Sequence, residues 1–70
     1  MSRYEMPAYV RDFIYQVGTR CKEFRKNLDY SSTQVASDLK LKKCNVVSFE
    51  NGYNNSMYIL SWYLERGFKL

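Results

Sequence analysis

Apolar residues recur in the first third of the chain at steps of three and four positions. This spacing places them on one face of a helix. It is kept by Met6, Val10, Phe13, Val17, Cys21, Phe24 and Leu28. Pro7 suits the first turn of that helix, where its missing N–H costs nothing. The pattern therefore predicts a helix from Pro7 to Leu28, with a kink or a boundary between two helices at Gly18.

Three shorter apolar patterns follow, and they predict helices at 32–39, 44–51 and 57–66. The residues expected to start or stop them are Ser31 or Ser32, Gly52, Asn55 or Ser56, and Gly67. Their inward faces are predicted to carry Val35, Ala36, Leu39, Val46, Phe49, Ile59, Leu60, Tyr63 and Leu64. No segment alternates as a strand would, so the predicted fold class is all-α in a single domain spanning residues 1–70.

The second and third predicted helices are joined by a tight turn, which suggests a helix-turn-helix. Counted from Ser32, positions 4, 8, 10, 15 and 18 of such a unit should be apolar, and position 5 should be small because the helices cross there. The chain meets these conditions with Val35, Leu39, Leu41, Val46, Phe49 and Ala36. From about Val17 to Leu64 it resembles the phage repressor/Cro family of XRE-like helix-turn-helix regulators. This resemblance implies a four- to five-helix lambda-repressor-like domain, here with an extended N-terminal helix.

Two further features carry the resemblance. The family often has an Arg in its first helix and Glu-Asn-Gly after its recognition helix, and here these are Arg25 and residues 50–52. The resemblance implies a partly buried ion pair between Arg25 and Glu50. Lys40 occupies the turn position that the family usually gives to Gly, so Lys40 is expected to adopt a left-handed conformation or a slightly different turn.

The resemblance also implies that a recognition helix at about 43–51 lies in the major groove of double-stranded DNA. Lys40, Lys42 and Lys43 surround its start and are expected to neutralise phosphates, although a solvated turn would look the same. The outward residues Lys43, Cys44, Val47 and Ser48 are expected to meet base edges. The alternatives are ordinary exposed surface or a protein partner, because Val and Cys are poor hydrogen bonders.

Contacts with the DNA backbone are expected from the segments that flank the recognition helix. Ser32 and Gln34 open the second helix, whose N–H groups and dipole favour a phosphate, while the alternative role of Ser32 is a plain N-cap. Asn51, Tyr53 and Asn54 follow the recognition helix, and their alternative role is turn chemistry.

Composition narrows the classes of function that remain. Eleven Lys+Arg against seven Asp+Glu give a net charge of +4, which permits a polyanionic partner. The lack of His, and of any base beside a Ser or Cys, argues against an enzyme. Cys21 and Cys44 are not spaced as metal ligands, so no metal or cofactor is expected. They are interpreted as reduced thiols of a cytoplasmic protein, and no apolar run is long enough to span a membrane.

Two functions follow from these observations. The first is a sequence-specific DNA-binding transcriptional regulator, most similar to a phage or mobile-element repressor or Cro, which binds a palindromic operator as a homodimer. The alternative is a protein-interaction module on a helix-turn-helix scaffold, such as an antirepressor or an inhibitor of a host factor.

Residues 1–16 precede the resemblance and are expected to form a dimerisation element. Val10, Phe13 and Ile14 lie on one predicted face, for which a domain of this size offers few partners. The alternative is that the extension folds back onto Tyr58, Trp62 and Phe68 and completes a monomeric core. The aromatic residues Tyr4, Tyr9, Phe13, Tyr58, Trp62 and Phe68 are expected to pack in a core or an interface rather than to stack on bases.

Overall fold

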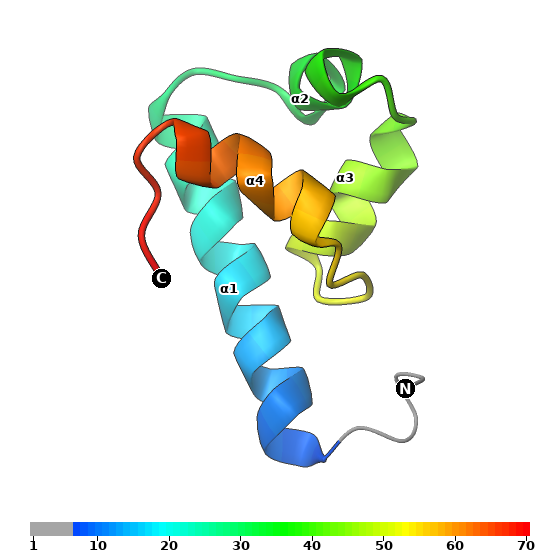
Figure 1. Cartoon of the computed structure of the whole chain (residues 1–70), viewed down its shortest axis with the longest axis vertical. Helices are drawn as coiled ribbons and strands as arrows, with labels where there is room; N and C mark the ends of the chain where they lie inside the picture. The colour runs from blue at the N-terminus through cyan, green and yellow to red at the C-terminus, as the bar shows by residue number, and fades with distance from the viewer. Residues whose placement is uncertain (1–6) are drawn as a thin grey trace.

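The computed structural model describes residues 7–70, whose regular structure is entirely helical (Figure 1). The helices are α1 (Ala8–Asn27), α2 (Ser32–Leu39), α3 (Lys43–Glu50) and α4 (Met57–Glu65). The C-terminal half of α1 packs against α3 and α4, whereas its N-terminal half projects beyond the other helices. The predicted all-α class is confirmed for the described part of the chain.

Serine side chains cap two of the four helices. Ser31 Oγ accepts a hydrogen bond from the Gln34 N–H (3.1 Å), and Gln34 Oε1 accepts one from the Ser31 N–H (2.7 Å). This reciprocal capping box makes Ser32 the first helical residue of α2 and not its cap. Ser56, rather than Asn55, caps α4 through a hydrogen bond from the Ile59 N–H to its Oγ (3.3 Å).

α1 continues through Gly18 as one helix, so Gly18 is not a boundary between two helices. The glycine has a different role. A Cβ atom at this position would lie 2.6 Å from the carbonyl oxygen of Phe49 and 2.7 Å from that of Glu50. Gly18 therefore lets the backbones of α1 and α3 approach more closely than any side chain would permit.

The core lies where the four helices meet and is rich in aromatic rings. Phe49 stacks on Tyr63 with ring centroids 5.8 Å apart, and Trp62 meets Tyr63 edge-on at 5.1 Å. The buried apolar residues are Val17, Cys21, Val35, Ala36, Leu39, Val46, Phe49, Ile59, Leu60, Trp62, Tyr63 and Phe68. Leu64, predicted to face inward, is 42% exposed, so that prediction is wrong, whereas Phe68 from the C-terminal segment is buried in the core.

The N-terminal half of α1 contributes no buried residue. From Pro7 to Gln16 every side chain is exposed or half-buried, and Val17 is the first member of the apolar stripe to reach the core. The alternative in which the extension folds back onto Tyr58, Trp62 and Phe68 is wrong. α1 is one continuous helix, and Trp62 and Phe68 are buried by other rings, Tyr30 and Phe24. Tyr4 and Met6 lie outside the described residues.

Candidate functional site

The turn between α2 and α3 depends on a left-handed lysine. Lys40 has φ 57° and ψ 41°, a conformation that usually costs a non-glycine residue about 1–2 kcal/mol. Two hydrogen bonds close the turn, from the Lys40 N–H to the Ser37 carbonyl (3.1 Å) and from the Leu41 N–H to the Ala36 carbonyl (2.8 Å). Leu41 packs against the core, while Lys40 and Lys42 on either side of it are exposed.

This turn is the start of a positively charged surface. Residues 39–49 contain three lysines and no acidic side chain. The acidic residues that border the segment are both engaged. Asp38 accepts a hydrogen bond from the Trp62 indole (3.1 Å) and pairs with Arg66 at 3.6 Å, and Glu50 is buried. The lysines therefore face solvent with little local compensation of their charge.

α3 separates into a buried and an exposed side. Val46, Phe49 and Glu50 are buried, which places the helix firmly on α1 and α2. Lys43, Cys44 and Val47 are exposed on the other side, with Val47 at 36% exposure, and Ser48 is half-buried. We call the exposed side, together with Lys40 and Lys42, the α3 face. The structure thus brings together five of the eleven residues predicted to contact DNA.

Ser48 adjoins this cluster on α3, and the other five predicted contact residues lie in different segments. Ser32 and Gln34 occupy the first turn of α2, and the Gln34 side chain is held in the capping box. Asn51, Tyr53 and Asn54 follow the opposite, C-terminal end of α3. Their local bonding is that of a turn, because the Tyr53 N–H donates to the Ser48 carbonyl (2.9 Å) and Asn54 Oδ1 accepts from the Ser56 N–H (3.0 Å).

A buried polar cluster fixes the orientation of α3. Arg25 forms a bidentate ion pair with Glu50, with Nε to Oε2 at 2.8 Å and Nη2 to Oε1 at 3.1 Å. Arg25 Nη1 also donates to the Tyr30 carbonyl at 2.8 Å. The Tyr63 hydroxyl donates to Glu50 Oε2 at 2.6 Å, so α1, α3 and α4 are joined through one carboxylate.

The contribution of Tyr63 to this cluster was not predicted from the sequence, which identified it only as a core residue. The signal available was its buried position, because a buried tyrosine hydroxyl usually needs a hydrogen-bond partner. Burial, and then the hydrogen bond to Glu50, raise the pKa of Tyr63 above its usual value of 10.0. The hydroxyl therefore stays protonated and acts as a donor.

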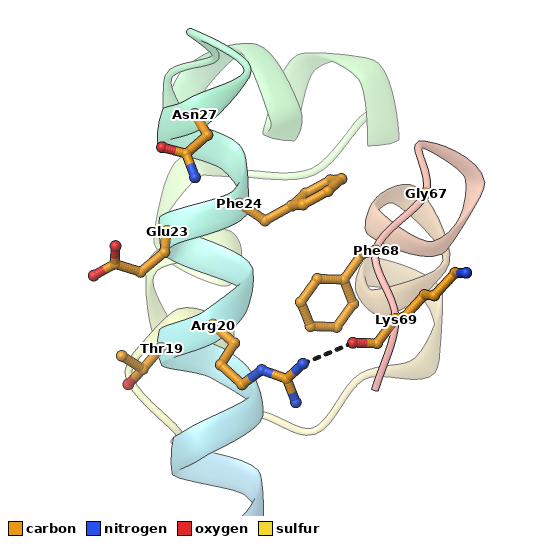
Figure 2. Close-up of a pocket in the computed structure, with 8 residues that line it drawn as sticks. All are labelled: Thr19, Arg20, Glu23, Phe24, Asn27, Gly67, Phe68 and Lys69. Carbon is orange, nitrogen blue, oxygen red and sulfur yellow. Dashed lines mark hydrogen bonds between the residues drawn. The ribbon is translucent and has the colours of Figure 1, made fainter.

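A second polar contact that the sequence did not reveal fixes the C-terminal segment (Figure 2). The Arg20 guanidinium on α1 donates to the carbonyls of Lys69 (2.9 Å) and Leu70 (3.1 Å). It also lies 5.5 Å from the centre of the Phe68 ring. The hollow beside it is open to solvent, and the two hydrogen bonds from Arg20 hold this segment on α1.

Potential metal ligands do not cluster in the described part of the chain. The described residues contain no group of three or more His, Cys, Asp or Glu side chains that could hold a metal ion. Both cysteines are free, and burial raises the pKa of the Cys21 thiol to about 12 while Cys44 is exposed. No helix between residues 7 and 70 is long and apolar enough to cross a membrane.

Comparison of the chain with protein-family models, curated proteins and solved structures gave no significant match. The resemblance to the repressor/Cro family therefore depends on the residues of this chain alone.

Proposed function

We propose that the protein is a sequence-specific DNA-binding transcriptional regulator of the phage repressor/Cro type. In this proposal α2, the turn and α3 form a helix-turn-helix, and α3 enters the major groove. The observation that supports it best is the α3 face, a lysine-rich turn that leads into an exposed helix side with no acidic residue from 39 to 49. Such a surface suits the closely spaced negative charges of duplex DNA.

The residues of the α3 face would have different roles. Lys40 and Lys42 would neutralise phosphates beside the groove, which adds affinity but no sequence preference. Lys43 in the first turn would reach either a phosphate or guanine O6 and N7. Val47, one turn further along, would contact a thymine methyl group. Ser32 and Gln34 would lie near a phosphate at the N-terminus of α2.

The buried cluster would support this mode of binding from behind. Base readout requires a recognition helix held within a fraction of an ångström. Arg25, Glu50 and Tyr63 link the C-terminal end of α3 to α1 and α4. The close approach of α1 to α3 at Gly18 limits movement of the same end.

The salt dependence of DNA binding tests the proposal. Replacing both Lys42 and Lys43 with Ala should lower the slope of log affinity against log salt by up to about 1.8, or about 0.9 for each lost phosphate contact. Arg11→Ala combined with Lys69→Ala is a matched control, because it removes the same charge from two exposed residues outside the α3 face. An unchanged slope in the Lys42/Lys43 variant, or an equal loss in the control, would contradict the proposed docking.

One observation favours the alternative, a protein-interaction module. Cys44 and Val47 make the centre of the exposed side of α3 more apolar than is usual for a helix that reads DNA. A Val47→Lys variant separates the two functions. Added positive charge should preserve or raise general DNA affinity, whereas a protein partner that buries Val47 should be lost from co-purification.

A further inference from the structure

An apolar groove lies on the side of α1 that faces the start of α4, and it is separate from the α3 face. Its volume is about 320 Å³, and Asn55 is its one polar lining residue. The remaining walls are formed by Val10, Phe13, Ile14, Val17, Phe49, Met57, Leu60 and Leu70. We call it the α1–α4 groove. With no charged residue and a single polar one in its lining, the groove fits an apolar occupant.

The helix that forms one wall of the groove is only lightly packed by the other described residues. Residues 8–16 make two and a half turns of helix, about 14 Å long, without one buried side chain. A helix in a protein is normally held by packing of its apolar face, because its own backbone hydrogen bonds stabilise it only marginally. Phe13, however, is 59% exposed at the edge of the groove. Packing of this face against a partner would supply further support.

We infer that the α1–α4 groove binds the same face of α1 from a second copy of the chain, which makes the protein a two-fold symmetric dimer. The groove and its required occupant are both present on one molecule. The groove is a cavity with apolar walls, and the α1 helix beside it carries Phe13, an exposed aromatic side chain. Such self-complementarity is what a two-fold interface needs, because each copy presents the cavity and the projecting side chain together.

The exposed apolar area is large enough for the centre of such an interface, but not for all of it. An aromatic side chain carries about 150–250 Å², so Phe13 alone leaves on the order of 100 Å² in water. Met57 and Leu70, also largely exposed, extend the surface of the groove to a few hundred Å². A typical stable interface buries about 800 Å² on each partner, around an apolar centre with a polar rim. The groove provides that centre, and the exposed residues of α1 on either side of Phe13 provide the rim.

Sedimentation of the whole chain tests the inference, which does not depend on DNA binding. At tens of micromolar the parent should sediment at twice the monomer mass of 8.4 kDa. Phe13→Glu should sediment as a folded monomer, because dimerisation would bury an unpaired carboxylate in the apolar groove of the partner, which is strongly unfavourable. Tyr15→Glu is the matched control, since Tyr15 is 58% exposed and does not line the groove, so this variant should remain a dimer.

Met57→Glu provides a second perturbation, from the α4 wall of the groove. Met57 is the first residue of α4 and largely exposed, so the change should leave the monomer folded and still prevent dimerisation. The inference would be overturned if the parent chain were still a monomer at about 100 μM. It would also be overturned if Phe13→Glu and Met57→Glu stayed dimeric, or if Tyr15→Glu dissociated with them.

Discussion

Replacing Arg25 with Ala should lower the free energy of unfolding by about 3–5 kcal/mol, the usual cost of removing one partner from a buried ion pair. The Glu50 carboxylate is 4% exposed and accepts three hydrogen bonds, two from Arg25 and one from the Tyr63 hydroxyl. After the substitution only the bond from Tyr63 remains. The substitution also removes the donor to the Tyr30 carbonyl in the connection between α1 and α2. The loss therefore consists mainly of an uncompensated buried charge.

This loss is large for a chain of 70 residues, whose total stability is expected to be about 4–10 kcal/mol. The unfolding midpoint should fall by about 12 °C or more, because each kcal/mol shifts it by roughly 4–8 °C in a domain of this size. Helical circular dichroism during thermal and urea unfolding measures the change.

Two control variants isolate the cause. Arg20→Ala removes an exposed guanidinium with two hydrogen bonds to backbone carbonyls, so its cost should be much smaller. Adding Glu50→Gln to Arg25→Ala removes the stranded charge and should recover part of the lost stability. A thermal midpoint for Arg25→Ala within one or two degrees of the parent would show that the buried pair contributes no stability and would refute the reasoning.

Two further predictions concern Gly18 and the cysteines. Gly18→Ala should destabilise the fold by about 1–3 kcal/mol in urea unfolding, although Ala is the better helix former, because the new Cβ would lie 2.6 Å from the Phe49 carbonyl oxygen. Thr19→Ala, at an exposed neighbouring site, is the control, and a more stable Gly18→Ala would contradict the packing argument. In thiol titration at pH 8–9, Cys44 should react at once and Cys21 only on unfolding, because burial raises the pKa of Cys21 to about 12. Rapid reaction of two thiols in the folded protein would show that Cys21 is accessible.

Much of the helical arrangement could be predicted from apolar spacing. The buried residues of α2 and α3 were identified correctly because a helix that is half buried repeats its apolar side chains at three and four positions. The left-handed turn at Lys40 was one of two predicted outcomes. Other features could not be predicted, because they depend on where a second element lies. Gly18 within a helical pattern indicates a weak point, but only the position of α3 shows that it is a close contact.

The lysines of the candidate site could be predicted from the sequence, whereas most of the buried cluster behind α3 could not. Lysines 40, 42 and 43 are close in the sequence, so any tight turn before α3 would gather them. The support behind α3 joins residues 25, 50 and 63, which are far apart in the chain, and Tyr63 carries no signal that distinguishes a hydroxyl donor from an ordinary core ring. The pairing of Arg25 with Glu50 was expected only from the family resemblance.

The apolar stripe of α1 has one spacing but two environments. From Val17 to Phe24 it is buried or half-buried against the other helices, and before Val17 the same spacing continues along a helix whose side chains are only exposed or half-buried. Apolar spacing predicts only that one face of a helix is buried. It does not show whether that face is buried by the same molecule or by another one. Val17 is the first residue of α1 that is buried in the core, yet the apolar spacing extends about two turns further toward the N-terminus. That persistence is what a second molecule would explain, and a dimer through the α1–α4 groove would leave the α3 face of each copy exposed.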